Sequence, residues 1–202
     1  PAHQFIDEKA QWNDISTAQG YGWSKHLAER EVWRGVNEGL AALILNSGLL
    51  LGDSMKESPF SEVFDWMFQK KKTIDGSFPW IDERDFIKIA EQLVDKGLKN
   101  EQFLVYNKES SFHQFITEMS NLQNSKSKFN SVTLTQLRRR ANIKRWVPFS
   151  KSTPALLNKH LLSLLTNKNA FSNQKVWQAV ELNLTDEINT FTKVAQQYKP
   201  LN

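Results

Sequence analysis

Tyr21 and Lys25 are the two residues of this sequence whose types and spacing most directly suggest chemistry. They lie four positions apart in YGWSKHLAEREVW, and residues i and i+4 share one face of an α-helix. A phenol has a pKa of about 10 and is a poor base at neutral pH, but an ammonium group one turn away lowers that pKa. Two interpretations are open: a proton-transferring pair, or the exposed edge of an amphipathic helix.

The segments around this pair alternate between helix and strand patterns. Apolar residues from Trp23 to Val36 recur at helical spacing, and Gly39 predicts the end of that helix. The continuous apolar run from Leu40 to Leu45 is typical of a strand buried on both faces of a parallel sheet. A helix followed by a buried strand predicts an α/β fold.

Further elements follow from the same patterns. The expected N-caps are Ser58 (with Pro59 at the first helical position), Asp82 or Asp85, and Ser110 or Ser111. The predicted elements are a helix over 58–70, an extended segment over 78–81, a helix from 82 or 85 to 97, a strand over 102–106, a helix from 110 or 111 to 119, and a final helix over 185–198.

Composition limits the kinds of protein this chain can be. With 202 residues, 40% of them hydrophobic, it can bury a core of about one domain. It has no cysteine and its four histidines fall at no metal-ligand spacing, so no metal is expected. The most apolar run, over 40–52, is too short to cross a bilayer. We expect a cytoplasmic protein without a membrane span.

Charge is distributed unevenly along the sequence. Between Met119 and Val180 there are eleven Lys and Arg residues and no Asp or Glu, while the rest carries 15 basic and 22 acidic residues. A solvated basic face is the preferred interpretation. The alternatives are binding of a nucleotide-sugar diphosphate, a coenzyme-A-like phosphate, a membrane surface or nucleic acid. The densest part of the region is RRRANIKRW, whose cations are Arg138, Arg139, Arg140, Lys144 and Arg145.

Several segments, taken in order, resemble the extended short-chain dehydrogenase/reductases of the NAD-dependent epimerase/dehydratase family, in particular dihydroflavonol-reductase-like proteins. YGWSK at 21–25 resembles the Tyr-x-x-x-Lys helix, and LILNSGLLLGD at 43–53 resembles the strand and loop that follow it. WIDERDFIKIAEQLV at 80–94 and QFLVYNKESSFHQFI at 102–116 resemble the elements after these, and FSNQKVW with the last helix resembles the family's C-terminal segment. Ser47 stands where proline is usual.

The resemblance implies the C-terminal part of a Rossmann-type parallel sheet plus a smaller, mostly helical substrate-binding subdomain. Residues 1–53 would end the Rossmann-type domain, and 54–202 would form the subdomain interleaved with the last Rossmann elements. The family's Gly-rich turn, which holds the dinucleotide pyrophosphate, has no counterpart in this sequence. We therefore expect the C-terminal portion of a larger enzyme, inactive as 202 residues alone.

The resemblance also implies NAD or NADP as the cofactor and a small-molecule substrate. Tyr21 would transfer the proton and Lys25 would lower its pKa and reach the nicotinamide ribose. Asn46 and Arg84 would contact the substrate, although Arg84 is equally well explained as an exposed residue near a helix start. The residues implied to bind the cofactor are Tyr21, Lys25, Asn46, Ser47, Gly48 and Leu49.

The implied activity is hydride transfer coupled to Tyr-mediated proton transfer, in an oxidoreductase or epimerase/dehydratase that acts on an alcohol, a ketone or a nucleotide sugar. The alternative is a non-catalytic protein of the same fold that senses a dinucleotide or binds an anion or nucleic acid. A homodimer through the helix that carries Val32, Trp33 and Val36 is also open, because these residues could instead face the sheet.

Overall fold

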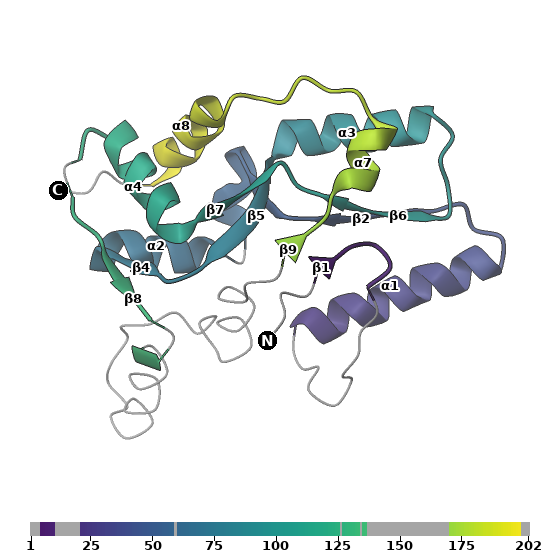
Figure 1. Ribbon diagram of the computed structural model, residues 1–202, viewed down its shortest axis with the longest axis horizontal. Coiled ribbons are helices and arrows are strands. Elements are labelled where there is room, and N and C mark those ends of the chain that lie inside the picture. Colours follow the sequence, from purple (N-terminus) through teal and green to yellow (C-terminus); the bar gives the residue numbers. More distant parts are fainter. Residues whose placement is uncertain are drawn as a thin grey trace.

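The helix and the strand predicted around the Tyr21–Lys25 pair both form in the computed structural model, which describes residues 5–10, 21–58, 60–125, 127–133, 135–136 and 170–198. α1 (Tyr21–Asn37) ends before Gly39, whose φ of 103° is the left-handed conformation expected of a helix terminus. β2 (Leu43–Ser47) pairs in parallel with β6 (Glu101–Val105). The predicted α/β architecture is confirmed (Figure 1).

Burial on this side of the molecule is lower than the sequence suggested. Leu43 to Asn46 are half-buried and Ser47 is exposed, so the prediction of a strand buried on both faces is wrong for the described chain. Val32, Trp33 and Val36 of α1 are likewise half-buried. A homodimer formed through that face of α1 stays a prediction. None of the helices in the described residues has the length and apolar character needed to span a bilayer.

The strands that follow β2 and β6 in the chain form a second sheet. Its order is β3 (Leu49–Leu51), β5 (Ser77–Asp82) and β7 (Lys108–Ser111), with β3 parallel and β7 antiparallel to β5. The extended segment predicted over 78–81 is thus the central strand of this sheet. β3 and β7 are short, and neither was predicted as a strand.

Two further strand pairs lie beside these sheets. β4 (Lys72–Ile74) pairs in parallel with β8 (Asn130–Val132), and β1 (Phe5–Ile6) pairs in parallel with β9 (Ala170–Phe171). β1 and β9 are far apart in the sequence, and Figure 1 shows the pair beside the first sheet.

The helices that cover the sheets are capped largely as predicted. Asp82 and Ser111 accept hydrogen bonds from the first-turn N–H groups of α3 and α4, as expected of N-caps. Ser58 does not cap α2: the N-cap is Phe60, and Ser58 Oγ accepts from the Phe60 N–H instead. Pro59 lies outside the described residues.

The helices described after α1 are η2 (Asp53–Glu57, a 3₁₀ turn), α2 (Ser61–Lys70), α3 (Glu83–Asp95), α4 (Phe112–Leu122), α7 (Gln174–Ala179) and α8 (Glu187–Gln197).

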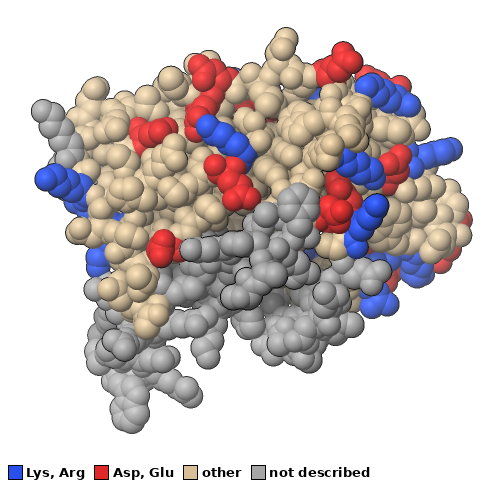
Figure 2. Space-filling view, in the orientation of Figure 1, with Lys and Arg blue, Asp and Glu red and all other residues tan. Residues whose placement is uncertain are grey.

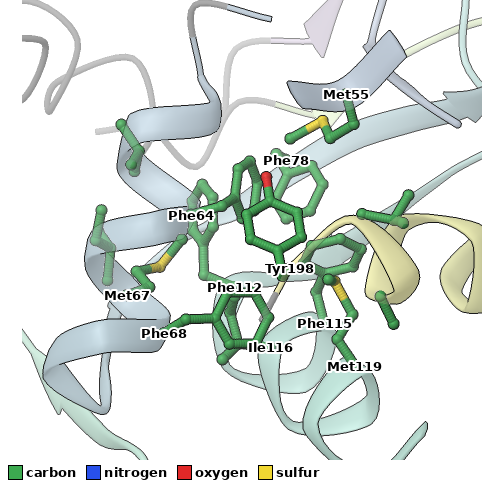
Figure 3. Packing of buried hydrophobic residues seen from close by; sticks show 14 of the residues in the cluster. Met55, Phe64, Met67, Phe68, Phe78, Phe112, Phe115, Ile116, Met119 and Tyr198 are labelled. Carbon is green, nitrogen blue, oxygen red and sulfur yellow. The ribbon is translucent and has the colours of Figure 1, made fainter. Parts of the chain in front are cut away.

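Buried apolar side chains form two clusters. The smaller packs α3 and α7 against β6 and includes Ile89, Leu93 and Val176. The larger joins α2, α4 and α8 to β5 and is rich in aromatic rings, among them Phe64 and Phe115 (Figure 3). The ring centroids of these two phenylalanines are 5.3 Å apart in an edge-to-face arrangement, which aromatic pairs prefer. The division at residue 53 into two domains stays a prediction.

Two buried carboxylates at the start of α3 bind α8 and the segment that precedes it. Asp85 is 1% exposed and accepts from the backbone N–H and the hydroxyl of Thr185, at 2.7 and 2.9 Å. Asp82 accepts from the Thr190 hydroxyl at 2.6 Å and from the Arg84 side chain at 2.6 and 2.8 Å. Residues about a hundred positions apart are therefore held by charge-assisted hydrogen bonds.

The first prediction concerns Asp85. We expect Asp85→Ala to lower the free energy of unfolding by about 2 kcal/mol, because two donors of Thr185 would lose their acceptor. Asp95→Ala, at the exposed end of the same helix, should change it by no more than about 0.5 kcal/mol. Urea denaturation measures both, and equal effects would contradict the structural role of Asp85.

The second prediction concerns the pH dependence that Asp82 contributes. Burial acts to raise the pKa of Asp82, but hydrogen bonds from Arg84 and Thr190 outweigh it and leave the pKa below its ordinary value. A carboxylate with a lowered folded-state pKa stabilises the fold above its unfolded pKa of about 3.9 and loses that contribution as pH falls through the folded pKa.

The stability difference between the wild type and Asp82→Asn should therefore be largest near neutral pH and narrow below about pH 4. Urea denaturation at a series of pH values measures this difference. If the stability difference between the two proteins stays constant down to pH 3, or increases in acid, the charge of Asp82 does not stabilise the fold.

Candidate functional site

The chain passes from the first sheet to the second at two adjacent points. β2 ends at Ser47 and β3 begins at Leu49, with Gly48 between them; β6 ends at Val105 and β7 begins at Lys108. The Gly48 N–H donates to the Val105 carbonyl at 2.9 Å, so the two crossing points are bonded to each other. Strands that separate in this way leave a space at their carboxyl ends, where open α/β sheets bind ligands.

Gly48 allows the two sheets to approach closely. A Cβ atom at this position would lie 2.7 Å from the carbonyl oxygen of Pro79 and 2.8 Å from its carbonyl carbon. Both are backbone atoms of β5, so no side-chain rotation could relieve the overlap. Gly48 is thus required by the contact between the end of β2 and the middle of β5.

A cavity of about 730 Å³ opens at this crossing. Residues from both sheets, from α2 and α4, and from β9 contribute to its lining. Its polar residues are Asn46, Ser47, Ser54, Glu57, Ser58 and Tyr106, and its remaining lining residues are Gly48, Leu49, Leu50, Phe60, Val63, Phe64, Phe78, Pro79, Leu104, Phe112 and Phe171.

The four consecutive residues predicted to bind a cofactor, from Asn46 to Leu49, all line this cavity. Lys25 is exposed on α1, and Tyr21 is the first residue of that helix, with its side chain outside the described part of the chain. α1 runs in the opposite direction to β2, so its first residues and the carboxyl end of β2 lie towards the same end of the first sheet (Figure 1).

Arg84 lies near the start of α3, as the second of its two interpretations has it. It is not among the described residues that line the cavity. Its guanidinium instead binds both carboxylate oxygens of Asp82, with Nε 2.8 Å from Oδ1 and Nη2 2.6 Å from Oδ2. The arginine holds the start of α3, and the structure gives no contact between it and the cavity.

Sequence reasoning missed three cavity residues that lie far apart in the chain, namely Glu57, Tyr106 and Phe171. The Tyr106 hydroxyl donates to the Phe171 carbonyl at 2.7 Å, which ties β9 to the end of β6. Burial raises the pKa of the Tyr106 phenol, and the charges of Glu109 and Glu8 raise it further, so this phenol stays protonated. No local pattern identifies these residues, because their proximity depends on the fold.

Glu83 binds the start of η2, next to the cavity residue Ser54. Its carboxylate accepts from the backbone N–H groups of Asp53 and Ser54 at 2.6 and 3.1 Å, and from the Ser54 hydroxyl at 2.6 Å. Gly52 leaves room for it, since a Cβ there would lie 2.2 Å from the Glu83 Cδ atom. The N–H groups at the start of η2 are therefore satisfied by a carboxylate of the chain itself.

The basic segment from Arg138 to Trp146 lies outside the described residues, so the predicted nucleic-acid interface is not placed. On the face shown in Figure 2, the basic and acidic side chains of the described residues are interspersed. No group of three or more His, Asp or Glu that could hold a metal ion occurs within the described ranges.

The third prediction tests the close approach at Gly48. Gly48→Ala should lower the free energy of unfolding by about 1 to 3 kcal/mol, because the new methyl group would force β2 and β5 apart. Ser47→Ala, at the exposed neighbouring position, should have an effect within about 0.5 kcal/mol. Urea denaturation compares them, and an unchanged midpoint for Gly48→Ala would mean that the two strands do not approach as described.

Comparison with known proteins gives similarity in structure only. No family model matches the sequence and no curated protein matches it. Among solved structures, a nucleoside-diphosphate-sugar epimerase from Pseudomonas aeruginosa is similar with a TM-score of 0.72 and 12% identity over 94% of this chain and 58% of its own. Gre2 from Candida albicans, solved with NADPH, is similar with a TM-score of 0.62 and 14% identity over 96% of this chain and 56% of its own.

UDP-glucose 4-epimerase from Thermotoga maritima, solved with UDP-glucose, has a TM-score of 0.59 and 12% identity over 87% of this chain and 52% of its own. The chain thus spans between half and three fifths of each of these proteins. Such a likeness shows the fold, and it agrees with the parallel strand pairs and covering helices described above. The chain has the α/β, Rossmann-like fold of these epimerases, as the sequence resemblance implied.

Proposed function

We propose that these 202 residues carry the catalytic pair and the substrate pocket of an NAD(P)-dependent oxidoreductase or epimerase/dehydratase. The observation that carries the proposal is the cavity at the sheet crossing, which is lined by the four consecutive residues from Asn46 to Leu49. It lies at the carboxyl ends of parallel strands, and the helix that begins with Tyr21 starts towards the same end of the first sheet.

Tyr21 is proposed as the proton donor to the substrate oxygen. In the reducing direction hydride adds to the carbonyl carbon while the phenol gives its proton to the carbonyl oxygen, which yields the alcohol and a phenolate. Lys25 is proposed to stabilise that phenolate, because an ammonium group at i+4 favours the charged form. In the oxidising direction the phenolate takes the proton back.

The nicotinamide of NAD or NADP would supply or accept the hydride. The residues present fit its reactive half: the Asn46 side chain and the Ser47 hydroxyl line the cavity, and no hydrogen bond between described side chains uses either of them. The pyrophosphate has no Gly-rich turn in this sequence to receive it. We propose that other residues supply that contact, and that the 202 residues alone do not turn over.

Oxidoreduction and epimerisation differ in the fate of the hydride. A dehydrogenase releases the reduced cofactor, whereas an epimerase returns the hydride to the opposite face of the same carbon. The similar structures include epimerases and an NADPH complex, and they support both forms of the proposal equally.

The fourth prediction tests the catalytic pair in the complete gene product. Tyr21→Phe should lower kcat about 10²- to 10⁴-fold, since it removes the transferred proton but keeps the ring. It should leave the dinucleotide affinity largely unchanged. Lys25→Met should lower kcat and also weaken dinucleotide binding. Reduced-nicotinamide absorbance measures the turnover of a panel of ketones, and chromatographic separation of the epimers measures the turnover of nucleotide sugars.

Arg30→Met serves as the matched control, because Arg30 is an exposed cation elsewhere on α1. It should leave both kcat and dinucleotide affinity as in the wild type. Full activity of Tyr21→Phe would refute the assigned proton donor. Turnover by the 202-residue chain alone would refute the requirement for a separate pyrophosphate site.

A further inference from the structure

We propose that the cavity at the sheet crossing selects an uncharged, apolar ring compound as its substrate rather than a phosphorylated one such as a nucleotide sugar. The inference rests on the function proposed above and names the substrate class of the same site. It is carried by three observations: the aromatic floor of the cavity, the engagement of half of its polar side chains by protein partners, and the sign of the charge among its described lining residues.

The floor of the cavity is a set of packed aromatic rings. Phe64, Phe78 and Phe112 line it and are at most 5% exposed, because they also belong to the larger hydrophobic cluster. Their ring centroids lie 4.7 to 6.2 Å apart, so each ring is held by the others. A fixed apolar surface of this kind gains most from a ligand that presents flat or cyclic hydrocarbon to it.

Three of the six polar side chains of the described lining already have protein partners. The Tyr106 hydroxyl donates to Phe171, the Ser54 hydroxyl donates to Glu83, and the Ser58 hydroxyl accepts from Phe60. Asn46 and Ser47, which are also proposed to contact the nicotinamide, are the remaining uncharged polar side chains of the described lining. With so few free polar groups in the lining, a ligand with many polar atoms would leave several of those atoms unpaired.

The charge at the rim disfavours phosphate. Glu57 is the one Asp, Glu, Lys or Arg among the described lining residues, and it takes part in none of the ion pairs between described residues. The nearby N–H groups of Asp53 and Ser54, which could otherwise receive an anion, are occupied by Glu83. Anionic ligands are usually bound by Arg, Lys or unpaired N–H groups, and the described lining residues offer a diphosphate none of these.

A matched pair of probes separates charge from shape. 2-Acetylnaphthalene is an uncharged aromatic ketone, and 2-naphthoate has the same rings with a carboxylate. We expect isothermal titration calorimetry of the 202-residue chain to show saturable binding of the ketone, about tenfold tighter than that of the carboxylate. UDP-glucose in excess should not displace the ketone.

Two variants tie this preference to the cavity. Glu57→Lys should lower the ratio of the ketone's affinity to the carboxylate's affinity by at least about fivefold. The reason is that it replaces a charge that repels the carboxylate with one that attracts it. Glu62→Lys makes the same change of net charge at an exposed position of α2 that does not line the cavity, and it should leave the preference unchanged. Both sites are exposed, so both variants are expected to fold, as circular dichroism would verify.

Three results would overturn the inference: 2-naphthoate binding as tightly as the ketone, displacement of the ketone by UDP-glucose, or absence of saturable binding of the ketone. A response to Glu62→Lys equal to that of Glu57→Lys would overturn it as well. The titrations contain no dinucleotide. A failure of the proposed hydride transfer would therefore leave these affinities intact and be recognised separately.

Discussion

The close approach of β2 and β5 at Gly48 is the constraint on which the site depends. Because this residue has no side chain, the chain can leave the sheet of β2 and β6 and join β5 one residue later. The second crossing, from β6 to β7, is fixed beside the first by the bond from Gly48 to Val105 and by that from Asn107 to Trp80. The cavity is the space that these two crossings leave between the sheets.

The same constraint explains why the aromatic cluster serves two purposes. β5 carries Phe78 and Trp80 into the larger cluster, and its end supplies Asp82, which binds Thr190 of α8. Asp82 therefore holds α8 against the cluster, and Phe64, Phe78 and Phe112 of the same cluster also line the cavity. The packing of α8 and the cavity floor thus use one set of rings.

The longer elements could be predicted from the sequence because their signals are local. The helix after Tyr21, the caps at Asp82 and Ser111, and the strand at 101–105 each follow from periodicity or capping chemistry within a few residues. β7, with the sequence KESS, has no apolar alternation and exists because β5 offers it a partner. For the site, the consecutive residues from Asn46 to Leu49 were predictable as one segment. Glu57, Tyr106 and Phe171 were not, because only the tertiary fold brings them together.

The most direct test of the account is a crystal structure of the complete gene product with bound NADPH. The account predicts that the nicotinamide ring lies against Asn46 to Leu49, with Tyr21 and Lys25 within hydrogen-bonding reach of the substrate oxygen position and the ribose. A dinucleotide whose nicotinamide ring lies away from this cavity, or a Tyr21 side chain directed away from it, would contradict the assignment of the cavity as the catalytic site.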